Sequence, residues 1–301
     1  MGGGMSGNPY LITGPALISF SGGRTSGYML KRIVDAYGGT LPDNVHVCFA
    51  NTGKEREETL RFVHECSTRW GVRIRWLERQ WPGRTTDHAE HFAEVGYNSA
   101  SRAGEPFAEL IRRKQYLPNP AMRYCTTELK VRVMKHFMMA QGYSHWVNAV
   151  GLRGDEMHRV FKQFALNEKG KERWKVVMPM ASHAGGMVSQ ADVQAFWRAQ
   201  DFDLGIHSAD GNCDLCFLKH RNSRMRRIRQ DPSAAEWWIA QEQLAKCSVK
   251  VGGEANARFQ ADESVEMLRT AVLNSPVMDL GTVEDDEFDA ECGLWCAGEA
   301  A

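Results

Sequence analysis

Two stretches of the chain combine residue types at spacings that suit chemistry: a loop of serines and glycines at residues 21–26, and a pair of cysteines at residues 213 and 216. The loop follows a short apolar run, residues 16–20, so a buried strand is expected to end where two glycines allow a tight turn. Free N–H groups at the start of the next helix favour a phosphate. The expected donors are the backbone at Gly22 and Gly23, the hydroxyls of Ser21, Thr25 and Ser26, and the guanidinium of Arg24. The loop is predicted to bind phosphate; the alternative is a strand-to-helix turn without a ligand.

Cys213 and Cys216 lie three positions apart on one turn, a spacing that suits a single metal centre and also a redox dithiol. Residues 1–5 have neither the basic start nor the apolar stretch of a secretion signal, so a cytoplasmic location with reduced thiols is expected. The eight cysteines are therefore interpreted as ligands, nucleophiles or core residues before disulfides. Cys48 and Cys66, on an expected strand and an expected apolar helix face, are interpreted as core residues.

The overall composition limits the partners that the chain attracts as a whole. Apolar residues make up 43% and charged residues 25%, as in ordinary globular proteins, and the formal net charge is zero. No global field therefore steers the chain to nucleic acid or to an anionic membrane, and such a partner must meet a local patch. No apolar stretch reaches the roughly 18 residues of a membrane span, so no membrane association is expected.

The spacing of apolar residues predicts alternating strands and helices. Strands are expected at residues 16–20, 45–49, 73–77, 146–150 and 174–178, and helices at residues 25–37, 57–70, 127–141 and 189–200. This alternation predicts an α/β fold with a doubly wound parallel sheet and helices on both faces. Because such sheets bind ligands at the carboxyl ends of their strands, the loop at residues 21–26 has the expected position for a binding site.

The chain is expected to divide into three regions. Residues 1–14 are rich in Gly, Ser, Asn and Pro and are interpreted as a flexible N-terminus. Residues 15–205 are expected to form the larger domain, which contains the loop at residues 21–26 and in which residues 78–120 carry weak signals typical of a mobile lid. Residues 206–301 form a smaller C-terminal domain with the cysteine pair, a basic run and an acidic tail that contains cysteines.

The loop at residues 21–26 resembles the PP-loop of the ATP pyrophosphatase superfamily, whose fifth residue is usually Asp where this chain has Thr25. Three further segments resemble the phosphoadenylylsulfate (PAPS) reductase-like branch of that superfamily. They are residues 51–60, which begin Asn51-Thr52-Gly53, residues 123–130, which contain Cys125 and Lys130, and residues 151–156, which contain Arg153. Four motifs in the expected order over residues 15–160 indicate this family.

The resemblance implies an adenine nucleotide, with ATP as the leading candidate and Mg²⁺ bridging its phosphates. The segment from Ser19 to Ser26 would hold the phosphates, while Asn51, Thr52 and Gly53 would line the adenosine side. Lys130 would lie close to the nucleotide, and Arg153 would reach its anionic end. Because Thr25 stands where the resembled loop usually has Asp, the sequence does not indicate which group takes over the function of that carboxylate.

The resemblance also implies a third cysteine ligand. Cys125 matches the first cysteine of the Cys-Cys pair of iron–sulfur sulfonucleotide reductases, whereas Thr126 replaces the second. Cys125, Cys213 and Cys216 are therefore predicted to carry a [4Fe–4S] cluster, with a fourth ligand from Cys292, Cys296 or Cys247. A bound zinc ion and free thiols are the alternatives.

The tail segment Glu291-Cys292-Gly293-Leu294-Trp295 is similar to the ending of sulfonucleotide reductases, in which the cysteine attacks the sulfur of the nucleotide. Trp295 replaces the family's histidine, and the preceding residues, 284–289, are mostly acidic. An acidic setting raises a thiol pKa and opposes attack by the thiolate. Cys292 is thus interpreted either as a nucleophile or as a ligand or ordinary tail residue.

A basic run follows the cysteine pair. Its members are Lys219, His220, Arg221, Arg224, Arg226, Arg227 and Arg229. The simplest interpretation of residues 219–229 is a solvated helix face paired with acids elsewhere. The alternatives are a site for the phosphate and sulfate of a sulfonucleotide, or contacts with a nucleic-acid backbone. Trp237 and Trp238 would then stack on bases, although helical spacing places one of them in the core.

Three functions fit these motifs. The first is an ATP-using enzyme that splits the α–β phosphoanhydride to adenylate a target, in sulfur transfer to a nucleic acid or a small molecule. The second is a sulfonucleotide reductase that releases sulfite, with Cys292 as nucleophile and a thioredoxin-like reductant as partner. The third is a non-catalytic nucleotide-binding accessory of a nucleic-acid-targeting complex. The sequence leaves the acceptor and the oligomeric state open.

Overall fold

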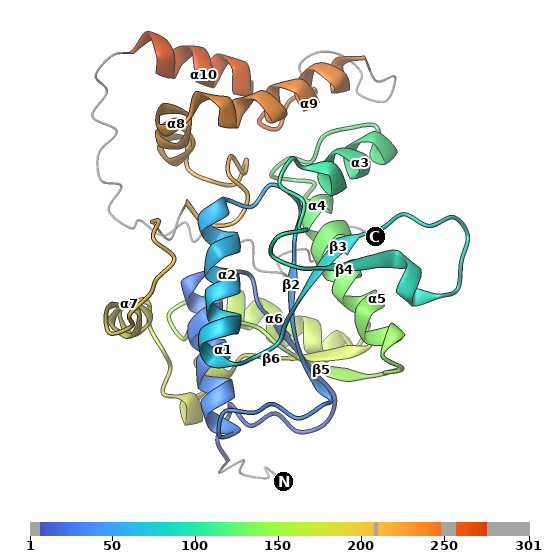
Figure 1. Ribbon diagram of the computed structural model, residues 1–301, viewed down its shortest axis with the longest axis vertical. Helices are drawn as coiled ribbons and strands as arrows, with labels where there is room; N and C mark the ends of the chain where they lie inside the picture. The colour runs from blue at the N-terminus through green and yellow to red at the C-terminus, as the bar shows by residue number, and fades with distance from the viewer. Residues whose placement is uncertain (1–6, 208–209, 248–256, 276–301) are drawn as a thin grey trace.

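A six-stranded sheet forms the centre of the computed structural model, which describes residues 7–207, 210–247 and 257–275 (Figure 1). The strand order is β4-β3-β2-β1-β5-β6, and all neighbouring strands pair in parallel except β3 and β4. The strands are β1 (Ala16–Ser19), β2 (Val45–Ala50), β3 (Ile74–Arg79), β4 (Phe92–Val95), β5 (Trp146–Ala149) and β6 (Trp174–Val177). The expected doubly wound α/β fold is confirmed.

The central strands are short apolar runs because both faces of the sheet are covered. Every residue of β1 and of β2 is buried. Ala16 of β1 pairs with Val45 on one side and with Val147 on the other, so the strand that precedes the serine–glycine loop lies inside the sheet. The chain leaves β1 toward β2 on one side and later returns to β5 on the other, which makes the β1–β5 boundary the topological switch point.

Helices cover both faces. Helices α1 (Arg24–Ala36), α2 (Glu57–Trp70) and α7 (Gln190–Arg198) contribute Met29, Phe62 and Trp197 to one core, together with Ile18 of β1. Helices α5 (Arg132–Ala140) and α6 (Met157–Lys169) cover the other face, where Phe137 and Val160 pack with Leu17 of β1.

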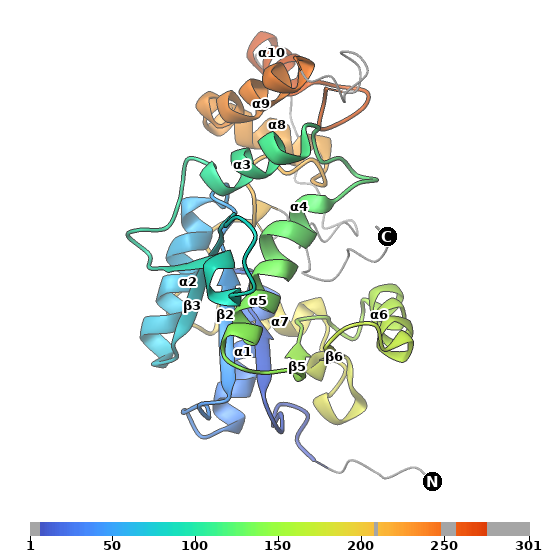
Figure 2. The same ribbon diagram turned by 90° about the vertical axis from the view of Figure 1, so that its right-hand side faces the viewer.

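A third apolar core lies at one end of the molecule, where α8 (Arg221–Gln230), α9 (Glu236–Lys246) and α10 (Val265–Asn274) gather beside α3 (Glu105–Lys114) (Figures 1 and 2). Phe107 of α3 packs against Trp238 of α9 at a ring-centroid distance of 5.9 Å. The domain boundary near residue 205 stays a prediction, but the C-terminal helices share their core with residues from the middle of the chain.

Residues 78–120 contain regular elements that the sequence did not reveal. They include a 3-10 turn (His88–His91), the antiparallel edge strand β4 and helix α3, in which Phe107 and Leu110 are buried. Strand β4 has four residues, none of them fully buried, so its apolar pattern is weak. Packing against β3 and against the C-terminal helices, rather than local pattern, accounts for these elements.

The helix expected at residues 127–141 has an irregular start. It consists of α4 (Tyr124–Thr126), a π-helical turn (Thr127–Val131) and α5. Such π-helical turns are rare in proteins, and those that occur are often found at functional sites. This turn carries Lys130, one of the residues predicted to lie at the nucleotide.

Candidate functional site

The loop after β1 has the backbone of an anion site. Helix α1 begins at Arg24 with Gly23 as its N-cap residue, and no side chain caps it. Its first N–H groups are therefore not occupied by a side-chain cap, and they lie at the positive end of the helix dipole. The loop lies at the switch point of the sheet, where doubly wound folds bind their ligands.

Gly22 is required by both conformation and space. Its φ of +81° lies in the left-handed region, and a Cβ atom there would lie 2.7 Å from Cγ2 of Thr59 and 3.1 Å from the ring of Phe49. Any larger residue would strain the backbone and displace α2 or β2. The glycine lets the loop turn tightly against the buried core.

The hydroxyls of the loop hold it together. The Oγ atoms of Ser21 and Ser26 lie 2.9 Å apart, and Ser26 Oγ also accepts from the Ser21 N–H at 3.2 Å and donates to the Gly23 carbonyl at 3.0 Å. Thr25 and Ser26 are both buried. These bonds fix the loop in one conformation, so a ligand would meet preformed backbone donors.

The loop after β5 lies directly against the loop after β1. A Cβ atom on Gly151 would lie 3.2 Å from Cα of Ser26, so only glycine allows this approach without a shift. Arg153 is 6% exposed and donates through Nη1 to Thr25 Oγ1 at 3.3 Å. Its Nε donates to Asp155 Oδ1 at 2.9 Å. The arginine is thus fixed beside the predicted phosphate site.

Two other predicted phosphate residues have partners elsewhere. The Arg24 guanidinium donates to both carboxylate oxygens of Asp203, at 2.7 and 2.5 Å, and to the carbonyl of Ile206 at 2.7 Å. Ser19 is buried and donates to Asn148 Oδ1 at 2.7 Å. A role for either residue at a nucleotide stays a prediction, and both have structural contacts that the sequence did not indicate.

Asn51 braces the loop after β2. It is fully buried, and its amide donates to Glu78 Oε1 at 2.6 Å and to the Ser101 carbonyl at 2.9 Å, while its Oδ1 accepts from the Gly53 N–H at 3.2 Å. Its side chain is therefore engaged within the protein. Contact of this loop with adenosine stays a prediction.

Thr52 and Lys130 meet at one buried carboxylate. The Thr52 N–H and hydroxyl both donate to Glu55 Oε2 at 2.8 Å, and Lys130 Nζ lies 3.7 Å from Glu55 Oε1. All three residues are buried. The structure thus brings two motifs that lie some 80 positions apart in the sequence to one carboxylate.

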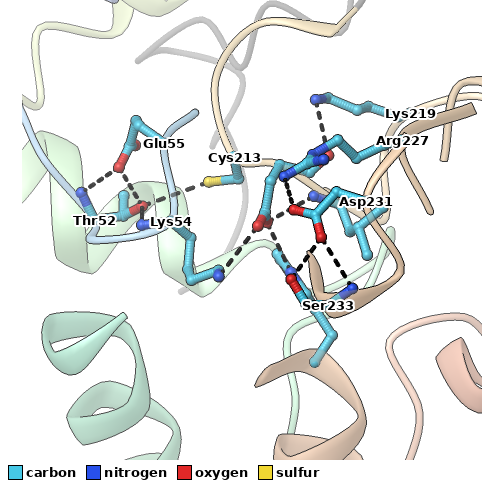
Figure 3. A network of polar contacts seen from close by, with 11 residues as sticks. Thr52, Lys54, Glu55, Cys213, Lys219, Arg227, Asp231 and Ser233 are labelled. Carbon is cyan, nitrogen blue, oxygen red and sulfur yellow. Dashed lines mark hydrogen bonds and ion pairs between the residues drawn. The ribbon is translucent and has the colours of Figure 1, made fainter. Parts of the chain in front are cut away.

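The cysteine turn is attached to the same loop (Figure 3). Glu55 and Cys213 form an antiparallel bridge, and the Asp214 N–H donates to the Lys54 carbonyl at 2.8 Å. Thr52 Oγ1 lies 3.5 Å from Cys213 Sγ, and Lys54 Nζ lies 3.1 Å from Asp214 Oδ2. Cys213 therefore lies at the carboxyl end of β2, the strand next to β1.

Two buried cations flank the cysteine turn. Lys219 Nζ donates to the carbonyls of Asp210 at 2.8 Å and of Asp214 at 3.3 Å, and no carboxylate of the described residues forms an ion pair with it. Burial lowers the pKa of Lys219, and Cys216 provides the largest opposing electrostatic contribution. Arg224 is 7% exposed, and its guanidinium has neither a hydrogen bond nor an ion pair within the described residues. Both cations attract negative charge at Cys216.

The described thiols provide part of the predicted metal site. Cys213 and Cys216 share one turn, with the Cys216 N–H 3.4 Å from the Cys213 carbonyl, and this arrangement fits two ligands of one centre. Burial and the Glu55 carboxylate raise the pKa of the Cys213 thiol, so binding of a metal there would have to displace a proton. Within residues 7–207, 210–247 and 257–275, no group of three or more Cys, His, Asp or Glu side chains is arranged to hold a metal ion.

The remaining cysteine predictions stay untested. Cys125 is half-buried on α4 at the edge of the third core, and Cys247 is exposed after α9. Cys292 and Cys296 lie outside the described residues. A cluster with a complete ligand set therefore stays a prediction, as does the nucleophile.

The basic run is largely bonded within the protein. Arg221 pairs with Glu263 at 2.7 Å, Arg227 with Asp231 at 2.9 Å, and Arg229 donates to the Ser275 carbonyl at 3.1 Å. The simplest interpretation, cations paired with acids elsewhere, describes these contacts. A nucleic-acid or sulfonucleotide site at residues 219–229 stays a prediction. Trp238 is a core residue, and its Nε1 donates to Asp214 Oδ1 at 2.8 Å.

Some residues of this site were not predicted from the sequence. Glu55 accepts hydrogen bonds from Thr52 within the β2 loop, and Asp214 joins the cysteine turn to that loop through its ion pair with Lys54. Lys219 and Arg224 are buried beside the turn. A carboxylate inside each motif was the available signal, since Glu55 follows Gly53 closely and Asp214 lies between the two cysteines. The ion pair between Lys54 and Asp214 spans a long stretch of sequence and leaves no local pattern that would predict it.

The strand order, the switch point and the loop after β1 define a doubly wound α/β protein with a candidate anion site. No family model matches the chain. The chain is 26% identical over 216 residues to the uncharacterized nin region protein ORF290 of Escherichia phage lambda, a match that spans 67% of this chain and 66% of that protein. The chain thus spans slightly less than two thirds of the length of this relative.

The chain is also similar to a solved structure, that of the U34-tRNA thiolase NcsA from Methanococcus maripaludis with its [4Fe-4S] cluster. The match covers 89% of this chain and 82% of that one. The sequence identity is 14% and the TM-score is 0.32. Of the residues that the structure describes, no helix is both long and apolar enough to cross a membrane.

Proposed function

We propose that this protein binds ATP at the switch point of its sheet and splits the α–β phosphoanhydride to adenylate an acceptor for sulfur transfer. One observation carries the proposal: the cysteine turn is hydrogen-bonded onto the loop after β2, next to the strand whose loop forms the candidate phosphate site. An adenylation site and a thiol pair at the same edge of one sheet suit a reaction that activates an acceptor and then delivers sulfur.

The backbone at Gly22 to Ser26 would receive the phosphates, because the first N–H groups of α1 have no side-chain cap. Arg153, fixed beside Thr25, would stabilise negative charge that develops when pyrophosphate leaves. In this reaction an oxygen of the acceptor attacks the α-phosphorus, the bond to the bridging oxygen breaks, and pyrophosphate leaves with the electron pair. Magnesium would neutralise phosphate charge.

Cys213 and Cys216 would provide two thiolate ligands for an iron–sulfur centre, with Cys125 and a tail cysteine as the remaining proposed ligands. Such a centre supplies a position at which sulfur is bound and made available for transfer. The chain's own contribution is to fix Cys213 against Thr52 and to surround the turn with the buried cations Lys219 and Arg224.

The test is ATP turnover by anaerobically purified, iron-loaded protein. Titration calorimetry with ATP and assays for AMP and pyrophosphate are expected to show both binding and release. Arg153→Gln is expected to lower turnover by about 10²-fold, because it removes a donor beside the phosphates. Arg159→Gln is the matched control, since Arg159 also pairs with Glu156 but belongs to α6 rather than to the loop.

Two results would redirect the proposal. If the loaded protein neither binds ATP nor releases AMP and pyrophosphate, the adenylation reaction is excluded. Sulfite release from adenylylsulfate or its 3′-phosphate, abolished by Cys292→Ser, would instead establish the reductase alternative. An iron and sulfide count with an absorbance spectrum near 400 nm tests the cluster separately from turnover.

A further inference from the structure

Helix α6 carries an apolar stripe on its outward face. Met157, Phe161 and Phe164 are 39%, 63% and 50% exposed, and they recur at helical spacing on one side of the helix. These large apolar side chains are only partly covered within the part of the chain that the structure describes. The stripe is therefore a surface available to a partner.

The exposure of the stripe follows from a firmly placed helix. Val160 and Gln163, on the side of α6 adjacent to the stripe, are its buried residues. The Asn167 side chain accepts from the Val176 N–H at 2.9 Å and donates to the Val176 carbonyl at 2.7 Å. These bonds fasten the end of α6 to the edge strand β6, and the helix lies at the outside of the molecule (Figure 2). Phe161 and Phe164 remain exposed on the helix held in this position.

Exposed cations without ion pairs in the described part of the chain occur on α6 itself and on the segment that follows it, up to Lys175. Within residues 157–175, six Lys and Arg side chains face only two acids, Glu168 and Glu172. Arg159 pairs with Glu156, but the other five are exposed and have no ion pair with any described residue. These five are Lys162, Lys169, Lys171, Arg173 and Lys175. Positive charge concentrates here although the chain as a whole is neutral.

Exposed aromatic rings among unpaired cations suit one class of ligand. Single-stranded nucleic acid presents phosphates that attract lysine and arginine, and unpaired bases that stack on aromatic side chains. The basic run at residues 219–229 has no comparable surface, because Arg221, Arg227 and Arg229 are bonded to acids or carbonyls and Arg224 is buried. The α6 surface therefore matches nucleic acid better than the segment that the sequence indicated.

The position of α6 connects this surface with the candidate site. The helix begins at Met157, three residues after the Gly154 that ends the loop with Arg153. Phe161 lies roughly one helical turn, about 6 Å, further along the axis. A strand bound along α6 would therefore have one end near the loop that carries Arg153.

We infer that the surface formed by α6 and β6 binds single-stranded nucleic acid, with its backbone on the exposed cations and a base stacked on Phe161 or Phe164. This strand supplies the acceptor of the adenylation reaction. The role as acceptor rests on the proposed function, whereas binding of the strand to the surface does not.

The test is fluorescence anisotropy with the full chain and labelled 20-mers of oligouridine and oligothymidine, without ATP, at 50 and 200 mM salt. Tighter binding of one 20-mer distinguishes RNA from DNA as the strand. Phe161→Ser with Phe164→Ser is expected to weaken binding at least tenfold, since stacking contributes about 1–3 kcal/mol per base. The double substitution Lys162→Glu with Lys171→Glu is expected to weaken binding. The slope of the logarithm of the binding constant against the logarithm of salt concentration is expected to become shallower by roughly 0.7 per lost phosphate contact.

The controls are Leu244→Ser, an equally exposed apolar residue on α9, and Arg112→Glu, an exposed cation on α3. Both are expected to bind the oligonucleotides as the unchanged protein does. Failure of the unchanged protein to bind either 20-mer at 50 mM salt overturns the inference, as does unchanged binding by both α6 variants. Loss of binding to phosphatidylserine vesicles without loss of oligonucleotide binding would identify a lipid surface instead.

The two proposals fail separately. If ATP turnover is absent while oligonucleotide binding depends on Phe161 and Phe164, the adenylation reaction is excluded and the surface remains. If turnover is present and the α6 variants bind normally, the acceptor binds elsewhere.

Discussion

Two stretches of the chain are similarly rich in lysine and arginine, and the structure uses them in opposite ways. At residues 219–229, cations are buried or bonded to acids and carbonyls, and they hold the cysteine turn and the C-terminal helices. At residues 157–175, exposed cations lie on the helix that carries the exposed phenylalanines and on the segment that follows it, and they have few partners among the described residues. A high density of lysine and arginine in the sequence therefore does not by itself indicate a binding surface. Whether these cations are available to a ligand depends on whether the fold brings acids next to them.

The largest expected difference concerns Lys219 and Lys175. Lys219→Met removes a buried donor and leaves the carbonyls of Asp210 and Asp214 unpaired, so the free energy of unfolding is expected to fall by about 2 kcal/mol. Lys175→Met, at an exposed position, is expected to change it little. Urea denaturation followed by circular dichroism measures both. Equal effects of the two substitutions would contradict the comparison.

The pH dependence of stability provides a second test at Lys219. Because burial lowers its pKa in the folded state, the unfolded chain binds more protons between that lowered pKa and the ordinary value near 10.5. Stability is therefore expected to rise with pH across this window through Lys219, and to lose that contribution in Lys219→Met. Urea midpoints measured for both proteins from neutral pH to about pH 10 report the difference. Parallel profiles would show that Lys219 is not the titrating group.

Substitution of Arg224 is expected to have the opposite effect on stability to substitution of Lys219. Its guanidinium is buried without a hydrogen bond or ion pair among the described residues, so Arg224→Met is expected to stabilise the metal-free protein by about 1 kcal/mol. In iron-loaded protein the gain is expected to shrink, because the cation then faces thiolate charge. Thermal unfolding of both forms makes the comparison. Strong destabilisation of the metal-free protein would reveal a partner for Arg224 among residues 208–209, 248–256 or 276–301.

The smallest expected effect belongs to Arg221. Its ion pair with Glu263 is partly exposed, so Arg221→Gln is expected to cost about 0.5 kcal/mol and less at high salt. Unfolding midpoints at 50 and 500 mM salt provide the measurement. A loss as large as that of Lys219→Met would place Arg221 among the cations that hold the fold.

The central sheet could be predicted because its strands are short apolar runs followed by turn residues, as at residues 16–20 and 45–49. Strand β4 and helix α3 could not, because β4 is only partly buried and α3 owes its position to a core shared with α9. Local periodicity does not contain that distant partner. The strand-to-helix turn at residues 21–26 could be predicted for the same local reason as β1, whereas its binding of phosphate stays a prediction.

The partners of individual site residues were largely inaccessible to sequence reasoning. Arg24 was assigned to phosphate from its place in the loop, but it meets Asp203 from far along the chain. The hydrogen bond between Thr52 and Cys213 likewise joins two motifs, and neither motif indicates in the sequence that it contacts the other. Long-range hydrogen bonds follow from tertiary packing, which one sequence does not display.

The attachment of the cysteine turn to the β2 loop has a thermodynamic consequence. Since Thr52, Lys54 and Glu55 contact both regions, whatever binds the turn and whatever binds the loop share one set of bonds. Linkage then requires reciprocity: if nucleotide changes the affinity of the thiols for metal by some factor, metal changes the affinity for nucleotide by that same factor. If both proposed ligands bind, occupancy of the cysteines and occupancy of the loop are coupled through these bonds.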